Sequence, residues 1–395
     1  MRTTHKLDLL VNAAQFDTCG YSSPRQKDTN SPLKYIYRAA LPEGGSVCLF
    51  KVLLTNVCVN DCAYCVNQCG RDIPRSTFQP DELAGTFMEL HQRRLAQGLF
   101  LSSGIGVNPN QTMEAMIKTV QILRSRHEYK GYVHLKILPG AKFDCVEEAC
   151  RVANRVSLNM EAPTAHHMVK LSHKKDLFND IVERMRWVKQ LMVKDNKLVP
   201  SGQTTQFVVG AADEDDRDIL RTTDALYHEI GLRRAYFSAF QPVSRSRLEG
   251  HPPTPLIREH RLYQVDWLLR VYGFPLREVE LALDETDNLP LKKDPKLLIA
   301  QRQPWLFPVD VNTAGRDDLL RVPGIGPVST DRIIRTRRDS RIDSLTQMQK
   351  MGVVTKRAAK YIWFQGMLEY EKQLAFLPEA EEEANTVNSL AVVLL

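Results

Sequence analysis

Stretches typical of buried strands alternate with stretches typical of amphipathic helices from residue 47 to residue 273. The first, 47–55 (VCLFKVLLT), is almost continuously apolar, as expected for a strand covered on both faces in a parallel sheet. About six successive strand–helix units predict an α/β fold with a parallel sheet, either open or curled into a barrel. The predicted strands are 47–55, 98–104, 131–140, 154–161, 204–211 and 233–243, and the predicted helices are 79–98, 113–126, 144–153, 178–192, 216–231 and 258–273.

The composition is that of an ordinary globular protein, with 43% hydrophobic and 25% charged residues. No run of 18 apolar residues occurs, and the start, MRTTHKLDLL, lacks the apolar segment of a secretion signal. We therefore expect a cytoplasmic protein with no membrane partner.

Charge is concentrated near the C-terminus. Residues 308–366 hold 11 Lys and Arg against 6 Asp and Glu, whereas 369–395 hold 1 Lys against 6 Glu. The basic segment favours binding to a polyanionic partner. The acidic tail is expected to compete with that partner for the basic segment. A solvated basic face followed by a disordered tail would have the same composition.

Three cysteines follow the first predicted strand at once, in the stretch CVNDCAYC with the spacing C-x3-C-x2-C. Thiols of a cytoplasmic chain stay reduced, so the cluster indicates metal binding rather than disulfides. A structural zinc site closes with four ligands. A [4Fe–4S] cluster held by Cys58, Cys62 and Cys65 would instead leave one iron open to another molecule. The alternative is a closed four-cysteine site in which Cys69 is the fourth ligand.

Cys58, Cys62, Tyr64 and Cys65 resemble the signature of the radical S-adenosylmethionine superfamily, C-x3-C-x-aromatic-C. The resemblance implies a partial (β/α)6 TIM-like barrel, a [4Fe–4S] cluster, and S-adenosylmethionine bound at the open iron. It also implies reductive cleavage of that cofactor to a 5′-deoxyadenosyl radical, with an electron donor such as a flavodoxin or a ferredoxin. Cys69 is then a bystander or an occasional substitute ligand.

The same resemblance suggests residues that seat the cofactor. Ser102, Ser103 and Gly104 end the second predicted strand, where relatives contact the methionine amino group, although the usual Gly-Gly-Glu form is absent. Asn159 and Glu161 end the fourth strand and resemble a pair that binds the ribose hydroxyls. A capped strand end would explain both residues without a cofactor. No catalytic residue for the substrate is assigned.

Residues 308–368 are predicted to form a small all-helical domain, and within it the segment DVNTAGRDDLLRVPGIGPVSTDRIIRTRR resembles a helix–hairpin–helix DNA-binding element. Backbone N–H groups around Gly324, Ile325 and Gly326 are expected to bind a phosphate, with Arg332 and Arg335 contacting its neighbours. Residues 343–362 repeat the layout more loosely. A helical module that binds protein or supports the barrel is the alternative.

From about residue 5 to 368, the chain resembles proteins described as putative DNA modification or repair radical enzymes. We expect an enzyme that modifies or repairs a nucleic acid, DNA rather than RNA. The alternatives are a non-catalytic or glycosylase-type DNA-binding protein with a structural cluster, and a radical enzyme acting on a small molecule or a protein. The predicted parts are a lead-in (1–45), the radical core (46–275), a linker (276–307), the helix–hairpin–helix domain (308–368) and a disordered acidic tail (369–395).

Overall fold

The computed structural model describes residues 3–14, 36–40 and 46–364. These residues divide into two compact units, an N-terminal unit that ends at Glu259 and a C-terminal unit that begins at His260. The division falls within α8 (Leu256–Arg270), earlier in the chain than the predicted linker. The predicted acidic tail lies outside the described residues.

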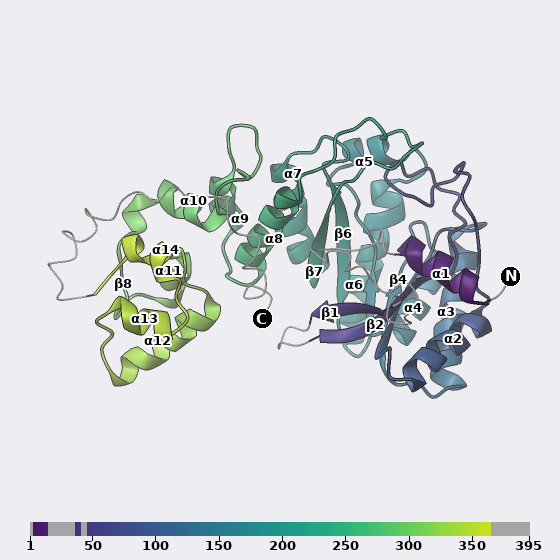
Figure 1. The fold of residues 1–395 in the computed structure, drawn as a ribbon, viewed down its shortest axis with the longest axis horizontal. Coiled ribbons are helices and arrows are strands. Elements are labelled where there is room, and N and C mark those ends of the chain that lie inside the picture. Colours follow the sequence, from purple (N-terminus) through teal and green to yellow (C-terminus); the bar gives the residue numbers. More distant parts are fainter. Residues whose placement is uncertain (1–2, 15–35, 41–45, 365–395) are drawn as a thin grey trace. The chain divides into compact units, whose positions relative to one another are not determined.

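Seven strands of the described N-terminal unit form one sheet in the order β1-β2-β3-β4-β5-β6-β7 (Figure 1). The strand β1 pairs antiparallel with β2, and every later pair is parallel. The strands are β1 (Ile36–Ala40), β2 (Ser46–Leu53), β3 (Gly98–Ser102), β4 (Tyr132–Lys136), β5 (Arg155–Ser157), β6 (Gln203–Val209) and β7 (Arg234–Ala239). The predicted parallel α/β sheet is thereby confirmed, and β1 is an addition within the predicted lead-in.

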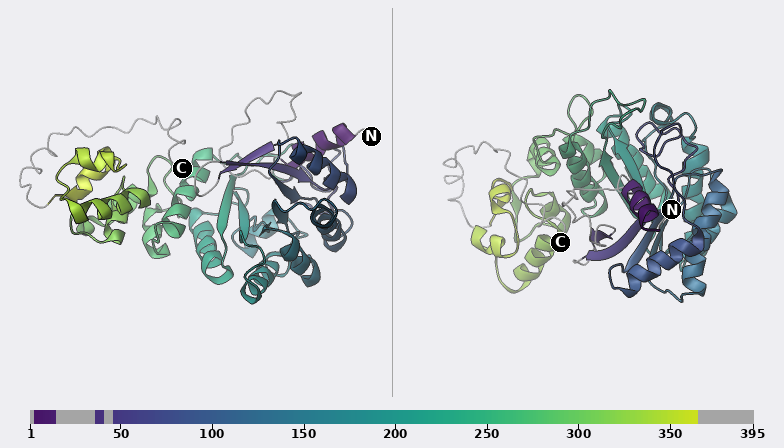
Figure 2. Two further views of the ribbon diagram at one scale, coloured as in Figure 1. Left: turned by 90° about the horizontal axis from the view of Figure 1, so that it is seen from below. Right: turned by 45° about the vertical axis from the view of Figure 1, so that its right-hand side comes forward.

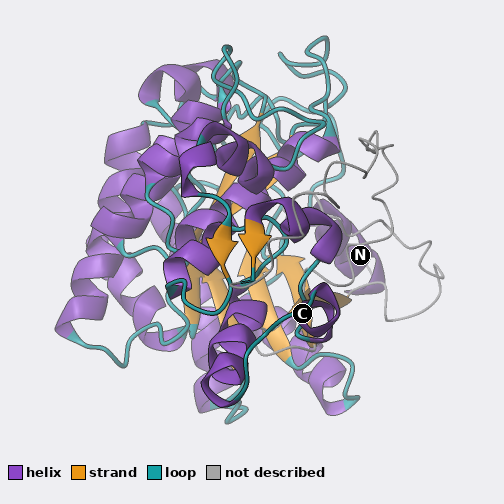
Figure 3. Cartoon of the chain, turned by 90° about the vertical axis from the view of Figure 1, so that its left-hand side faces the viewer, coloured by secondary structure: helices purple, strands orange, loops and turns teal. Residues whose placement is uncertain are grey.

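Sequential strand order determines where the helices lie. Right-handed crossovers between neighbouring parallel strands place all the connecting helices on one face, so the sheet curves around its other face into a partial barrel. Figures 2 and 3 show the helices gathered along one side of the strands. These helices are α2 (Pro80–Gln92), α3 (Pro109–Ser125), α4 (Phe143–Val152), α5 (Ala165–Leu171), the π-helix η3 (Leu177–Val182), α6 (Glu183–Lys194), α7 (Asp216–Ala225) and the π-helix η4 (Leu226–Ile230), with α1 (Thr3–Ala14) preceding the sheet.

The outer face of the sheet, which the helices cover, is apolar. Phe50 of β2 stacks on Phe87 of α2 with ring centroids 6.4 Å apart, and Phe207 stacks on Phe237 at 6.0 Å. Five strand residues that point the same way are each 0% exposed: Leu99, Leu101, Val133, Leu135 and Val209. Burial of such side chains stabilises the fold by about 25 cal/mol per Å² of apolar surface.

After α8, the C-terminal unit contains short helices where a linker was expected. These are α9 (Leu276–Val279), the 3-10 helix η5 (Glu280–Ala282), α10 (Pro295–Arg302) and the 3-10 helix η6 (Pro304–Leu306). Arg321 donates to both carboxylate oxygens of Glu278 at 2.8 and 2.9 Å, and Lys296 donates to the Ile325 carbonyl at 2.6 Å. The segment is therefore packed against the module that follows it.

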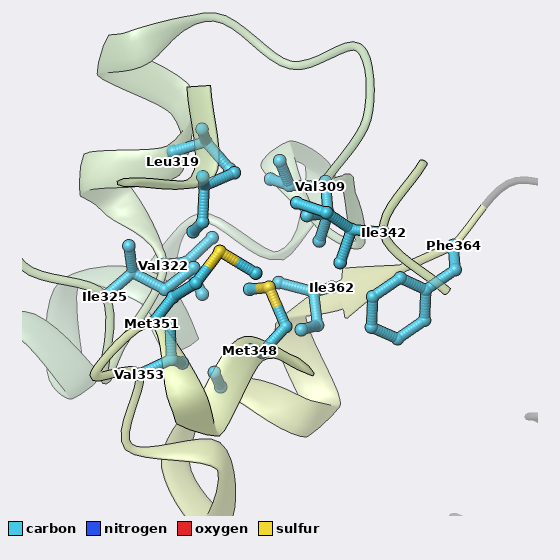
Figure 4. Close-up of a cluster of buried hydrophobic side chains, with 13 residues drawn as sticks. Val309, Leu319, Val322, Ile325, Ile342, Met348, Met351, Val353, Ile362 and Phe364 are labelled. Carbon is cyan, nitrogen blue, oxygen red and sulfur yellow. The ribbon is translucent and has the colours of Figure 1, made fainter. Parts of the chain in front are cut away.

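Two helical hairpins share one apolar core in that module (Figure 4). The core gathers Leu319, Val322, Ile325, Ile333, Met348 and Val353 from both hairpins. The hairpins consist of α11 (Arg316–Arg321) with α12 (Pro327–Asp339), and α13 (Leu345–Lys350) with α14 (Thr355–Ala358), followed by the 3-10 helix η7 (Ala359–Tyr361). The module was expected to be wholly helical, but a parallel pair of short strands, β8 (Val309–Asp310) and β9 (Ile362–Trp363), joins its two ends. Val309 and Ile362 lie in the core, so the pair is fixed by burial.

Each hairpin turn packs against the other hairpin. Gly324 has a φ of +86°, and a Cβ there would lie 2.5 Å from the Val354 carbonyl oxygen, while Val354 N–H donates to the Gly324 carbonyl at 2.9 Å. Gly352 has a φ of +87°, and a Cβ there would lie 3.3 Å from the Ser329 hydroxyl. Glycine is required at Gly324 both by its backbone conformation and by the space available.

No helix of the described residues is long and apolar enough to cross a membrane.

Gly324→Ala should destabilise the protein more than Gly273→Ala. Both glycines have positive φ, at +86° and +75°, but a Cβ at Gly273 meets nothing within 4 Å. The control therefore carries only the backbone strain, about 1 kcal/mol, whereas Gly324→Ala adds a steric overlap with backbone. Urea denaturation of the intact protein measures the free energy of unfolding of each variant. Equal losses would show that the Val354 contact yields without cost.

Candidate cluster and cofactor site

The cysteine loop leaves β2 at the carboxyl end of the parallel strands, where sites of such folds gather. Two side chains hold it in shape. Asn56 donates to the Pro74 carbonyl at 2.8 Å and accepts from Ser76 N–H at 2.8 Å. Arg75 donates to the Asn67 and Gln68 carbonyls, each at 2.8 Å. The cysteines are thus carried by a loop that is hydrogen-bonded across its own base.

Gly104 joins the end of β3 to this loop. Its N–H donates to the Thr55 carbonyl at 2.7 Å, and any Cβ at this position would overlap the Val57 carbonyl oxygen. The absence of a side chain lets the two backbones meet just before Cys58. The structure therefore gives Gly104 a packing role, and its contact with the cofactor stays a prediction.

Cys58, Cys62 and Cys65 lie close enough to affect one another electrostatically. Burial raises the pKa of Cys62, and the Cys58 thiolate adds to that shift. Burial and the neighbouring Cys62 thiolate raise the pKa of Cys65 to about 12. Three thiolates so placed need a cationic partner, because desolvation and mutual repulsion both oppose their charges.

In the described part of the chain, no three His, Cys, Asp or Glu side chains are arranged to bind a single metal ion. Cysteines that ligate a [4Fe–4S] cluster each bind a different iron, so their sulfur atoms need not converge on one point.

Lys175 is a site residue that sequence reasoning missed. Its side chain is 8% exposed, and Nζ lies 3.6 Å from Glu161 Oε1 and donates to the Tyr64 hydroxyl at 3.2 Å. Burial alone would lower the pKa of Lys175, but the Cys62 thiolate and the Glu161 carboxylate outweigh it and raise that pKa. No motif marks this lysine, because it reaches the cysteines only through the fold.

Glu161 lies beside these groups at the carboxyl end of the sheet. Its backbone bridges to β6, donating to the Gln206 carbonyl and accepting from Val208 N–H, each at 2.9 Å, and its φ is +64°. Oε1 faces Lys175, whereas Oε2 is buried without a hydrogen-bond partner. A left-handed backbone at a glutamate and an unpaired buried oxygen are both costly, and such strain is concentrated at functional sites.

The structure brings the other predicted cofactor residues to the same end of the sheet with differing support. The Ser103 hydroxyl is buried without a hydrogen-bond partner. Ser102 is 1% exposed and Asn159 is 8% exposed. Burial raises the pKa of Tyr64 well above its ordinary value, and Cys62 and Glu161 add to the shift, so the phenol stays neutral.

Cys69 contacts the backbone of Asn60 and the side chain of Lys174. Its N–H donates to the Asn60 carbonyl at 2.7 Å, and its sulfur lies 3.7 Å from Lys174 Nζ. Lys174 also donates to the Val59 carbonyl at 2.8 Å, so its side chain links Cys69 to the start of the loop.

The residues present fit an iron–sulfur cluster with a bound polar cofactor. Three thiols, one buried ammonium group and two buried unpaired oxygens, Glu161 Oε2 and Ser103 Oγ, are the donor set that such a pair of groups needs.

The predicted phosphate-binding residues lie on the first hairpin of the C-terminal unit. Ile325 is 1% exposed and belongs to the apolar core, so only its backbone is available to a ligand. Arg332 is exposed and donates to the Met351 carbonyl at 3.3 Å, and Arg335 is exposed one turn further on. Gly326 caps the start of α12, with Pro327 in the first turn.

No family profile matches this chain, and none of the curated proteins matches it. Solved structures show partial similarity. HydG, a maturase of the [FeFe]-hydrogenase, aligns with a TM-score of 0.45 at 13% identity, covering 55% of this chain and 49% of HydG. Methylornithine synthase (PylB) aligns with a TM-score of 0.45 at 16% identity, covering 54% of this chain and 58% of PylB.

The cobalamin-dependent S-adenosylmethionine radical enzyme OxsB aligns with a TM-score of 0.34 at 10% identity, covering 76% of this chain and 46% of OxsB. The chain thus spans about half the length of the structures it matches. At TM-scores below 0.5 these similarities carry no argument about activity.

Proposed function

We propose that this protein is a radical S-adenosylmethionine enzyme that modifies or repairs a nucleic acid, DNA rather than RNA. The observation that carries the proposal is the pairing of the C-x3-C-x2-C loop with the two unpaired buried oxygens of Glu161 and Ser103. All lie at the carboxyl end of the parallel sheet, on residues that the sequence pattern assigns to the cluster and its cofactor.

Each residue has a defined task in this proposal. Cys58, Cys62 and Cys65 hold the cluster, Lys175 balances their charge, and Glu161 Oε2 accepts hydrogen bonds from the ribose hydroxyls of the cofactor. When bound, the reduced cluster and S-adenosylmethionine supply a 5′-deoxyadenosyl radical that abstracts a hydrogen atom. The electron comes from a donor protein such as a flavodoxin or a ferredoxin.

The C-terminal hairpins support a nucleic acid as the substrate. The first turn ends at the start of α12, where backbone N–H groups and the helix dipole favour an anion. Arg332, Arg335 and Arg338 are exposed along this helix at spacings of three residues. Contacts of this kind bind the phosphate backbone rather than base edges, so sequence preference should be weak.

Replacing Cys58, Cys62 or Cys65 with Ala should abolish cluster assembly, because each supplies one iron ligand. Anaerobic reconstitution followed by iron and sulfide analysis and visible absorbance measures the cluster. Cys69→Ala and Cys150→Ala are matched controls that should retain it, since Cys69 contacts Lys174 and Cys150 is buried on α4. Loss of the cluster in Cys69→Ala would instead indicate a closed four-cysteine site.

Lys175→Met should weaken both cluster retention and S-adenosylmethionine binding. It removes the cation from a buried group of thiolates and a carboxylate, and breaking such a pair costs about 3–5 kcal/mol. Lys175→Arg should restore much of the loss, because the charge returns. Lys118→Met, at an exposed position of α3, is the control. Iron content and equilibrium dialysis of the cofactor provide the measurements, and parental values in Lys175→Met would contradict the assigned role.

The nucleic-acid substrate is tested by incubating the reconstituted protein with S-adenosylmethionine, a reductant and DNA or RNA made from deuterated nucleotides. Deuterium should appear in 5′-deoxyadenosine. In the variant Arg332→Glu with Arg335→Glu, binding should weaken and its salt dependence should flatten by roughly 0.9 in slope per lost duplex phosphate contact.

Cofactor cleavage without substrate should persist in that variant. Arg93→Glu with Arg94→Glu, in the N-terminal unit, is a control with the same change of charge. No deuterium transfer from either nucleic acid, together with unchanged binding by the hairpin variant, would favour a small-molecule or protein substrate.

A further inference from the structure

The proposed function gives no role to Lys296, a lysine buried within the C-terminal unit. It is the second residue of α10 and is 9% exposed. Its Nζ donates to the Ile325 carbonyl at 2.6 Å and lies 4.7 Å from the centroid of the Tyr272 ring. Among the described residues, Asp294 supplies the one negative charge that acts on it. An ammonium group so enclosed is costly, because one hydrogen bond and one aromatic ring replace the water that it loses.

Lys296 and Tyr272 both contact the turn of the first hairpin. Ile325 is the middle residue of the PGIGP turn, and its side chain lies in the apolar core (Figure 4). A Cβ on Gly326 would lie 3.2 Å from the Tyr272 hydroxyl, so this tyrosine lies against both the ammonium group and the turn. The residues after α8 and the start of α10 therefore support the backbone on which a phosphate is expected to bind.

The Ile325 carbonyl and the Gly326 N–H belong to one peptide group. This peptide is trans, so its C=O and N–H point in opposite directions, and a donor on the carbonyl leaves the N–H open on the other side. No side chain of the described residues caps the start of α12. A cation on the carbonyl polarises the peptide and strengthens the hydrogen bond that its N–H donates. Lys296 can therefore act on a phosphate through this peptide without touching it.

The charge of Lys296 depends on what surrounds it. Burial lowers the pKa of Lys296 to about 7, and Asp294 opposes that shift. The Asp294 carboxylate has other partners, because it accepts from Leu297 N–H at 3.2 Å, accepts from Gln264 at 3.3 Å and lies 3.5 Å from Arg357. The amine is thus only partly protonated at neutral pH, and an anion bound at the turn would raise its pKa.

Tyr272 and His260 are neighbouring titratable side chains, but neither changes its charge between pH 7 and 9. Burial raises the pKa of Tyr272 and Asp294 adds to the shift, so the phenol stays neutral. Burial and the Arg261 guanidinium lower the pKa of His260 against the opposing effect of Asp294, so the imidazole is neutral above pH 7. Protonation that accompanies phosphate binding in this range therefore points to Lys296.

We propose that Lys296 is a positioning residue of the phosphate site at the first hairpin turn, and that it takes up a proton when a nucleic-acid phosphate binds to the Gly326 N–H. The proton comes from the solvent, and the phosphate supplies the negative charge that balances the ammonium group. Binding should then weaken as the pH rises above 7, by up to about ten-fold per pH unit. This inference rests on the proposed function and adds to it a dependence of substrate affinity on pH.

The test is isothermal titration of the intact reconstituted protein with duplex DNA and with RNA at pH 8, in buffers with different heats of protonation. The dependence of the binding heat on the buffer gives the number of protons taken up. The parent should take up a large fraction of one proton. Lys296→Gln, which keeps a donor for the Ile325 carbonyl, and Lys296→Met, which does not, should both lose this uptake and the change of affinity between pH 7 and 9. Lys292→Gln, at an exposed position before α10, should keep both.

Proton uptake that persists in Lys296→Gln would overturn the inference and leave the lysine a structural contact. A parent that binds nucleic acid without taking up a proton would overturn it as well, whether or not the variants fold. In both cases binding remains, so the proposed function stands. Absence of DNA and RNA binding in the parent would instead count against the nucleic-acid substrate, and the inference would fall with it.

Discussion

The alternation of side chains along the parallel strands is the constraint on which the rest of the structure depends. Residues such as Leu99, Val133 and Phe237 point outward into the helices, and each neighbour along the strand must then point inward. Because the strands follow one another in order, the helices that connect the parallel strands all lie outside, and they leave the inner face uncovered. One pattern thus produces both the apolar core and the place where chemistry can occur.

At the carboxyl end of this sheet, a single buried ammonium group connects three parts of the chain that are distant in sequence. Lys175 contacts Tyr64 in the cysteine loop and Glu161 after β5. Its positive charge stabilises the negative charges of the Cys62 thiolate and the Glu161 carboxylate. Buried charges are stable only when they are matched. The thiols, the carboxylate and the ammonium group are therefore mutually dependent, and a bound cluster would enter an environment that is already electrostatically balanced.

Local patterns predicted the elements of the fold well. The apolar run at β2, the helix signals of α2 and α3, and the double-glycine turn near Gly324 all act within a few residues, so sequence reasoning could find them. Long-range facts were out of reach. No sequence pattern around Lys175 predicts that it lies beside Cys62. Likewise, no pattern around Gly104 predicts its close contact with the Val57 carbonyl. The segment expected to be a linker contains α10, whose first turn is capped by Asp294. Lys296 of this helix donates to the Ile325 carbonyl of the first hairpin, a contact that exists only in the folded unit.

The reciprocal packing of Gly324 and Gly352 has a consequence for how the C-terminal module opens. Each turn is covered by the first residues of the helix in the other hairpin, and both hairpins supply the same core. Neither half can unfold locally without uncovering the turn of the other. The module is thus one cooperative unit, and its backbone amides should be protected from hydrogen exchange together, as a single block, even though its two halves differ in sequence.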